Sequence, residues 1–360
     1  MLTLDGQQKR DLRETIIAAF PGVPEVERMV SDYLSLNLAT VAAPAGDLQG
    51  QVFDLIQWAE ARGRLGDLIL AARYSNPDNP QLYAFAFRLG LTSSDHDRGT
   101  LEALVGENTT FLDPQTWRAE LSKLEWKVCR IDLDEKGTGT GFLVGPDAVL
   151  TNHHVMQKAI NGQLEHQRFT CLFDFKMTED EVVSPGTRFD LAADDDWLID
   201  SAPHSAVDLL PDPKPGDPGP EELDLALVRL GEPAGSLGVA GADDGAVREW
   251  VSVARDPIDL TQLHAISILQ HPDRLPLKLA LGMGQNLEVN AAGNRVRYSV
   301  PTLPGSSGSP IFDSEWKLVA LHHSGDPDTI KPEFNEGIPM SIIAQRPAVA
   351  AYLDSLDDGV

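Results

Sequence analysis

Apolar residues recur at helical spacing in the first quarter of the chain and form short β-type runs through much of the remainder. Leu12, Ile16 and Phe20 stand four residues apart, and Pro21 directly after them ends a helix. The same spacing predicts further helices over residues 24–34, 47–59, 65–74 and 80–89. Because the connections between these segments are short, residues 1–92 are predicted to form an all-α bundle.

A polar segment follows the bundle and is predicted to be a linker over residues 93–112. Pro114 then opens a helix that is expected to run to about residue 126. Beyond it, short β-type runs are separated by Gly, Pro and Asp turns, which is typical of an all-β unit over residues 113–355. The Pro-rich stretch 211–222 is predicted to be a solvated surface loop.

Charge and cysteine content narrow the range of partners and compartments. The chain has 29 basic and 55 acidic residues, a net charge of −26, which argues against nucleic acid or an anionic membrane as a partner. The N-terminus has no apolar signal region, and no apolar run is long enough to span a bilayer. Cys129 and Cys171 lie in apolar runs and are expected to be buried free thiols. These features predict a cytoplasmic protein.

Three stretches carry residues suited to nucleophilic catalysis. The glycine-rich turn PGSSGSPIF places Ser307 between small neighbours, so that a substrate carbonyl can approach it. The run VLTNHHVM places His154 directly after a β-type segment. The run LDLALVRL holds Asp224 in apolar surroundings, where a carboxylate is costly unless it is hydrogen-bonded, for example to the imidazole of a general base.

The order His, Asp, Ser in these contexts resembles the trypsin/chymotrypsin superfamily of serine proteases, in particular its bacterial trypsin-like and glutamyl-endopeptidase-like branches. The resemblance covers roughly residues 125–350 and implies a double β-barrel that hydrolyses peptide bonds. It makes Ser307 the nucleophile, His154 the base and Asp224 the residue that orients the base. His153 is then only a neighbour. The oxyanion hole would be formed by the backbone N–H groups of Gly305 and Ser307.

The chain departs from the digestive enzymes of this superfamily at the position before the nucleophile. Those enzymes carry an aspartate that pairs with a newly freed N-terminus, whereas this chain has Ser306. Activation is therefore expected not to use a freed N-terminus. For substrate binding, Thr302 and His322 fall where glutamyl endopeptidases bind an acidic side chain, and the strand from His323 would pair with the substrate backbone. An acidic residue and a small or apolar one both stay open for the side chain before the scissile bond, called P1.

The N-terminal bundle also resembles a known group. The stretch LIQWAEARGRLGDLILAARYSNPDNPQL, residues 55–82, is similar to effector-associated domain 1 of bacterial conflict systems. Those domains are death-like helical adaptors, so the resemblance implies homotypic pairing with the same domain on a partner protein. A simple folding or docking appendage is the alternative interpretation of the bundle.

These observations predict a multidomain protein, a death-like all-α adaptor followed by a trypsin-like double β-barrel. The predicted function is that of a serine endopeptidase acting on protein substrates as the effector of a bacterial defence system. The alternative is a binding or scaffold protein on a protease fold that no longer cleaves. No HExxH or Cys/His spacing is present, so no metal and no cofactor is expected.

Overall fold

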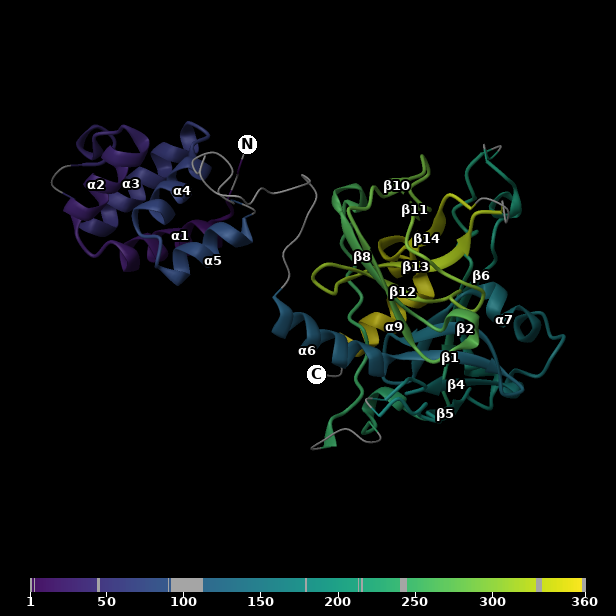
Figure 1. The fold of residues 1–360 in the computed structure, drawn as a ribbon. Helices are drawn as coiled ribbons and strands as arrows, with labels where there is room; N and C mark the ends of the chain where they lie inside the picture. The colour runs from purple at the N-terminus through teal and green to yellow at the C-terminus, as the bar shows by residue number, and fades with distance from the viewer. Residues whose placement is uncertain are drawn as a thin grey trace. The chain divides into compact units, whose positions relative to one another are not determined.

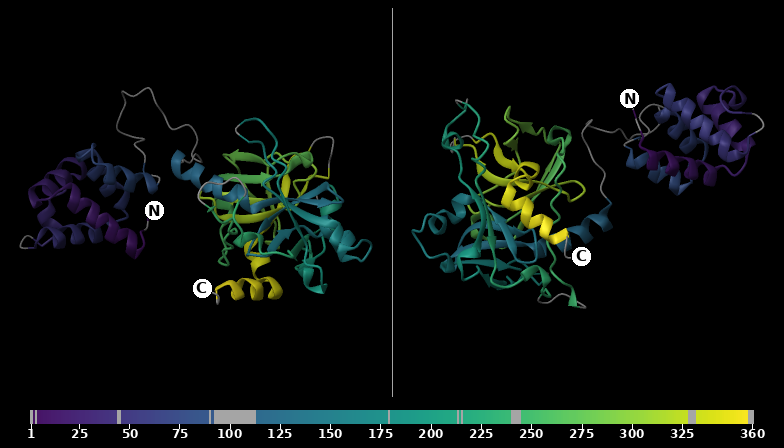
Figure 2. Two further views of the ribbon diagram at one scale, coloured as in Figure 1. Left: turned by 90° about the horizontal axis from the view of Figure 1, so that it is seen from below. Right: turned by 180° about the vertical axis from the view of Figure 1, so that it is seen from behind.

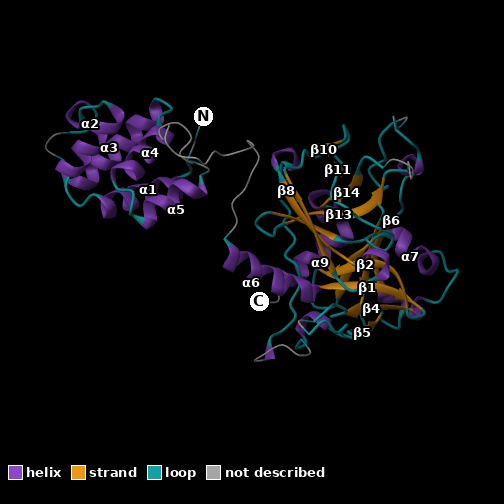
Figure 3. Ribbon diagram, viewed as in Figure 1, coloured by secondary structure: helices purple, strands orange, loops and turns teal. Residues whose placement is uncertain are grey.

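The computed structural model describes residues 2, 4–43, 46–89, 91, 113–178, 180–212, 214, 216–239, 245–327 and 332–357. The chain divides into two compact units, Met1–Val105 and Gly106–Val360, and each is described here by itself. Figure 1 and Figure 3 show that the first is built from helices and that the second is rich in strands. The predicted linker 93–112 lies outside the described residues, so the domain boundaries stay a prediction.

The described part of the first unit confirms the predicted helical bundle. Its helices are α1 (Gly6–Ala19), α2 (Val23–Leu34), α3 (Leu48–Ala61), α4 (Leu65–Ser75) and α5 (Pro80–Arg88). Their starts follow from the sequence: the Asp5 carboxylate accepts the Gln8 N–H to cap α1, and Asp47 caps α3 by accepting from Gly50. The apolar faces, including Leu12 and Ile16, are buried in one core.

The second unit contains strands throughout and a few helices. Its helices are α6 (Pro114–Leu124), α7 (His153–Ile160), α8 (Met340–Ala344) and α9 (Pro347–Asp357). Its strands are β1 (Val128–Leu133), β2 (Lys136–Leu143), β3 (Ala148–Thr151), β4 (Phe169–Phe173), β5 (Thr187–Asp190), β6 (Leu198–Ala202), β7 (Leu225–Arg229), β8 (Ala265–Gln270), β9 (Lys278–Met283), β10 (Glu288–Val289), β11 (Val296–Tyr298), β12 (Pro310–Asp313), β13 (Leu318–Gly325) and β14 (Asn335–Pro339).

These strands form two antiparallel sheets that curl into half-barrels, which confirms the predicted trypsin-like double barrel. The first sheet has the order β5-β4-β1-β2-β3-β7-β6 and the second the order β10-β11-β14-β13-β12-β8-β9. Cys129 on β1 and Cys171 on β4 are buried free thiols inside the first sheet, as predicted. None of the helices in the described part of the chain has the length and apolar character needed to span a bilayer.

Two helices cover the outside of the half-barrels. In α6 the Trp117 ring lies 5.0 Å from the ring of Trp316, and Trp117 O accepts the indole N–H of Trp316. Figure 2 shows the C-terminal helix α9 along the surface of the barrel unit, where the Tyr352 hydroxyl donates to Asp147 in the turn before β3. Both helices therefore join the second unit as part of its core, since their apolar side chains pack against both sheets.

The described part of the Pro-rich stretch 211–222 is a largely exposed surface loop, as predicted, but it is anchored to the barrel unit by side-chain hydrogen bonds. Asp212 accepts two hydrogen bonds from Arg297 of β11, and Lys214 donates to Glu336 of β14. Asn294 donates its side-chain amide to Pro218 O at 2.8 Å. The stretch lies in the connection between β6 and β7, which are both strands of the first sheet. The contacts above nevertheless hold it against the second sheet. Charged residues placed between prolines predict exposure locally, but here their partners lie more than 70 residues away.

Candidate active site

His154 and Asp224 are brought together by the pairing of β3 with β7. Thr151 at the end of β3 lies opposite Ala226 of β7 in the antiparallel register. His154 follows in the first turn of α7, and Asp224 directly precedes β7, so both side chains project from the same end of the sheet. The ring Nδ1 of His154 lies 2.6 Å from Asp224 Oδ2, and the His154 backbone N–H donates to Asp224 Oδ1 at 3.0 Å.

Asp224 is fully buried and is held as a carboxylate. Burial alone would raise the pKa of Asp224, but the hydrogen bonds to His154 and His323 outweigh it and hold the pKa well below its usual value. Its backbone is fixed as well, because its N–H donates to Pro203 O and its carbonyl accepts from the Asn152 side chain. The His154 side chain is 35% exposed while Asp224 is 0% exposed, so the imidazole stands between a buried anion and the open surface.

Ser307 lies in the turn between β11 and β12 of the second sheet, and this turn contacts the first sheet. Thr140 of β2, in the first sheet, donates its backbone N–H to Ser307 O and its hydroxyl to Gly305 O. Gly308 has φ +88°, and a Cβ there would stand 2.1 Å from Thr140 O, so only glycine fits this close approach. The turn is thus pressed against β2 and is ordered by contacts across the barrel interface.

The hydrogen bonds of this turn leave two N–H groups available. Leu303 N–H donates to Ser306 Oγ, and Ser306, Gly308 and Ser309 donate their N–H groups to backbone carbonyls. Within the described residues, the N–H groups of Gly305 and Ser307 donate to no protein acceptor. They are the pair that the sequence predicted as oxyanion donors, and both residues are partly exposed, so a substrate oxygen could reach them.

The Ser307 hydroxyl is the least constrained member of the predicted triad. Among the residues that the structure describes, no hydrogen bond joins it to His154 or to any other group. Hydrogen bonds between a nucleophile and its base are often long in ligand-free enzymes and shorten when substrate binds. The structure therefore brings His154 and Asp224 into contact and places the Ser307 turn at the barrel interface beside β2.

The predicted substrate-binding residues Thr302 and His322 make internal hydrogen bonds. Thr302 Oγ1 donates to Asn335 Oδ1 at 2.9 Å, and Nδ1 of His322 lies 2.6 Å from the Tyr298 hydroxyl. Burial is the main cause that lowers the pKa of His322, to about 3. The ring is therefore neutral at neutral pH, and any substrate carboxylate would meet an N–H dipole rather than a full positive charge.

His323 has a contact that the sequence did not predict. We expected its strand to offer backbone groups to the substrate, but its side chain is buried, and ring Nδ1 lies 2.9 Å from Asp224 Oδ2. The other ring nitrogen, Nε2, lies 2.9 Å from Ser324 Oγ and 3.6 Å from Glu336 Oε1. Burial opposes a charge on this ring, but the hydrogen bonds to Asp224 and Glu336 raise the pKa of His323 above its usual value. Asp224 thus lies between two imidazoles.

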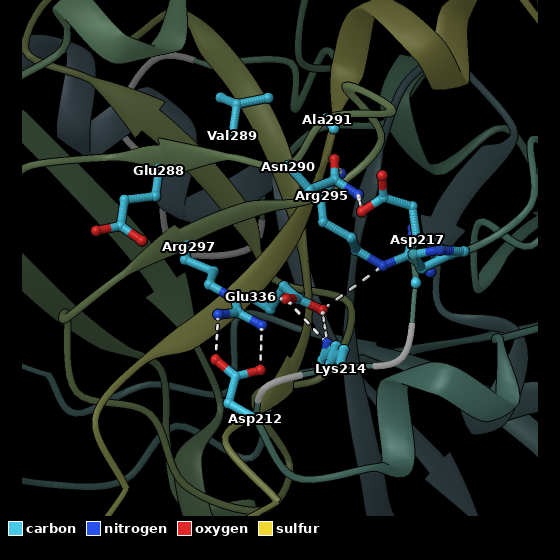
Figure 4. Close-up of a pocket in the computed structure, with 12 residues that line it drawn as sticks. Asp212, Lys214, Asp217, Glu288, Val289, Asn290, Ala291, Arg295, Arg297 and Glu336 are labelled. Carbon is cyan, nitrogen blue, oxygen red and sulfur yellow. Dashed lines mark hydrogen bonds and ion pairs between the residues drawn. The ribbon is translucent and has the colours of Figure 1, made fainter.

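A buried ion-pair network continues from His323 toward a pocket of about 390 Å³. Arg295 donates to Asp208, which lies 3.7 Å from His323 Nε2, while Lys214 and Arg297 both donate to Glu336. Figure 4 shows Lys214, Arg297 and Glu336 of this network meeting at the pocket wall. The ligand atoms of Asp208, His323 and Glu336 lie close enough to hold a metal, but Arg295 and Lys214 already neutralise both carboxylates.

The chain matches two family models. Effector-associated domain 1 matches residues 2–90, and the trypsin-like peptidase domain matches residues 139–321. The uncharacterized protein y4fB of Sinorhizobium fredii is 27% identical over 277 residues, which cover 74% of this chain and 38% of that protein. This chain therefore spans well under half the length of that relative.

Two solved structures are similar over much of the chain. Deg5 has a TM-score of 0.38 and 15% identity, covering 65% of this chain and 94% of that one. An inactive mutant form of Rv3671c from M. tuberculosis H37Rv has a TM-score of 0.37 and 12% identity, covering 69% and 96%.

Proposed function

Because this chain belongs to the trypsin-like peptidases and begins with an effector-associated domain 1, we propose that it is a serine endopeptidase using His154, Asp224 and Ser307. The observation that carries the proposal is the pair of free N–H groups at Gly305 and Ser307, next to the Ser307 hydroxyl, which is the only hydroxyl of the turn that makes no hydrogen bond within the described residues. These three groups are partly exposed and are therefore accessible to a substrate carbonyl, as an attacking hydroxyl and an oxyanion hole require.

Each residue then has one role in the reaction. Ser307 Oγ attacks the substrate carbonyl carbon and gives its proton to Nε2 of His154. Asp224 keeps the other ring nitrogen, Nδ1, protonated and stabilises the imidazolium that forms. The negative carbonyl oxygen accepts from the N–H groups of Gly305 and Ser307. His154 returns its proton to the leaving amine, and water repeats the sequence on the acyl-enzyme.

The test of this function is hydrolysis of an unstructured protein by the full-length chain. We expect mass spectrometry to find new N-termini in the substrate after incubation with wild-type protein. A Ser307→Ala variant should produce none. Substrate that stays intact with both proteins over a broad panel of sequences would favour the binding or scaffold alternative.

The turn around Ser307 needs no freed N-terminus to order it in this proposal. Ser306, at the position where digestive enzymes carry aspartate, accepts the N–H of Leu303 within the turn itself. The turn is also held from outside, since Asp273 N–H donates to Pro304 O. We expect the uncleaved chain to be competent, which is checked by comparing the activity of intact protein before and after proteolysis near residues 125–130. Activity that appears only after cleavage would contradict this.

We assign the helical unit to recruitment, as the effector-associated domain match supports. The partner would be a protein bearing the same kind of domain, and the setting a bacterial defence response in the cytoplasm. Tyr33 on α2 and Phe53 on α3 are large side chains that stay about half exposed and are available for such a contact. We expect the full-length chain to co-purify with a partner domain. A Tyr33→Ala, Phe53→Ala double variant should lose this co-purification.

Substrate preference is predicted for an acidic P1 residue. His322 is neutral and buried beside Tyr298, and Thr302 lies in the same region with no basic side chain bonded to it. In a peptide library, we expect cleavage after Glu or Asp to exceed cleavage after small apolar residues by about 10-fold. This ratio corresponds to one hydrogen bond from a neutral donor to the substrate carboxylate. His322→Leu should remove this preference. Cleavage mainly after Arg would contradict the assignment of the pocket.

His323 is predicted to position Asp224, and the effect should appear in the pH profile. His323→Ala removes a charge-assisted hydrogen bond and should lower kcat about 10- to 100-fold. His323→Asn keeps an N–H donor near the position of Nδ1 and should restore most of kcat. Because the hydrogen bonds to Asp224 and Glu336 raise the pKa of His323, protonation of this ring places positive charge beside the triad, and both variants remove that charge. The acidic limb of kcat/KM should therefore move to higher pH.

The control for this experiment is His264→Ala, which removes a half-buried histidine bonded to Gln285 O outside the triad. It should leave both kcat and the pH profile unchanged. A His323→Ala protein with a wild-type pH profile would mean that this ring only fills space.

A further inference from the structure

Two histidines beside Asp224 take no part in the proposed triad. His153 precedes the base at the start of α7, and His204 lies just after β6. One ligand atom from each of His153, His204 and Asp224 lies within 4.8 Å of the other two. Asp224 is therefore surrounded by four imidazoles: His154 and His323 hydrogen-bond to it, and His153 and His204 stand close without bonding to it.

The rings of His153 and His204 each have a buried nitrogen atom without a hydrogen-bond partner among the described residues. In both rings this atom is Nδ1. The Oδ1 atom of Asn152, whose amide donates to the Asp224 carbonyl, is unpartnered in the same way. His153 is only 7% exposed, so its ring nitrogen is aimed into the interior. Buried polar atoms are rarely left unpaired, so the two ring nitrogens near the Asp224 carboxylate indicate a missing partner.

Asp224 has capacity left for such a partner. An ionised carboxylate offers about four acceptor positions. Among the described residues, Oδ2 accepts from the rings of His154 and His323, and Oδ1 accepts only the His154 backbone N–H. One lone pair of Oδ1 is therefore unused, and any group that takes it can leave the existing hydrogen bonds in place.

The chemistry of the three ligands selects a metal cation. Two of the three ligands are imidazoles whose buried Nδ1 atoms have no partner within the described residues, and the lone pair of an imidazole nitrogen can bind a metal ion. Two neutral imidazoles and a carboxylate are a common protein set for Zn²⁺, which binds them at about 2.0–2.2 Å. Tetrahedral ligation at those lengths separates ligand atoms by about 3.4 Å, so small rotations from the present spacing complete the site.

We propose that His153, His204 and Asp224 form a zinc-binding site that reversibly silences the proposed triad. The ion takes a lone pair of Asp224 and places positive charge beside His154. Both effects weaken the His154 base, because Asp224 then stabilises the imidazolium less. The silencing rests on the proposed function, whereas binding of the ion does not.

Binding is tested without catalysis, by calorimetric titration of full-length Ser307→Ala protein with zinc chloride alone. We expect a site of one zinc ion per chain, and magnesium, which prefers all-oxygen octahedral sites, should not fill it. His204→Ala in the same background should weaken this binding by at least about 10-fold, the loss seen when even supporting groups of a zinc site are removed. His264→Ala is the matched control and should bind like the parent.

Silencing is tested with a fluorophosphonate probe that labels an active serine. Zinc should slow labelling of the wild-type chain, while His204→Ala should be labelled at the wild-type rate and resist zinc. If His204→Ala does not reach the parent unfolding temperature, His204→Asn, which keeps a polar side chain, takes its place. A wild-type chain that the probe does not label even without zinc would contradict only the proposed function. Calorimetry would still show whether the zinc site exists. Zinc binding that is absent, or is unchanged in both His204 variants, overturns the proposal.

Discussion

Replacing Ser307 by alanine is expected to lower kcat for peptide hydrolysis by about 10⁶-fold, to the level left by binding and oxyanion contacts alone. The substitution removes one oxygen atom, and that oxygen makes no hydrogen bond within the described residues, so folding should not suffer. The turn is held by the backbone contacts of Thr140 and Gly308, which the variant keeps. Activity on a fluorogenic peptide and the unfolding temperature are the measurements.

Two further variants make this result specific. Ser314→Ala, a change of the same kind at a half-buried serine past the end of β12, should leave kcat unchanged. Because a triad acts as one unit, His154→Ala should match Ser307→Ala, and the double variant should lose nothing more. Additive losses, or a Ser307→Ala protein that retains activity, would mean that another group attacks the substrate.

Asp224→Asn is expected to lower kcat by about 10⁴-fold with little change in KM. The asparagine has nearly the same shape, but its NH₂ group cannot accept the N–H groups that Asp224 now receives from His154. The imidazole is then held in the wrong tautomer, with its proton on the nitrogen that should receive one from Ser307. The pH dependence of Asp224→Asn activity, measured beside wild type, checks this explanation.

The control for the Asp224 variant is Asp190→Asn on the edge strand β5, where the aspartate is exposed. It makes the same change of charge and should not affect kcat. A fall of less than about 10-fold in Asp224→Asn would show that the His154 tautomer is set by other contacts, with His323 and His153 as the nearest candidates.

The fold was predictable from the sequence because its signals are local. Helices α1 and α3 begin at aspartate caps that can be identified in the sequence, and apolar residues at helical spacing mark their buried faces. Short β-type runs between turn residues predicted the strands of the second unit. His154, Asp224 and Ser307 could be proposed as a triad for the same reason, since each lies in a short recognisable context of its own.

Contacts set by sheet register could not be predicted in this way. His323 reaches Asp224 from 99 positions further along the chain, and nothing near either residue encodes that pairing. His204 is likewise an isolated histidine in a polar loop, and only the fold brings it beside His153. The expectation of no metal rests on local spacing, which carries no information about the proposed ligands His153 and His204, 51 residues apart. The ion pairs that anchor Asp212 and Lys214 to the second sheet could not be predicted from the sequence for the same reason.

The most direct test of the central claim is covalent labelling of the full-length chain with a fluorophosphonate probe, followed by mass spectrometry of the modified peptide. Such probes react only where a serine is activated by its base and its adduct oxygen is held by oxyanion donors. The account predicts one adduct per chain, on Ser307, and none in Ser307→Ala. A wild-type chain that stays unlabelled, or carries the adduct on a different serine, would contradict it.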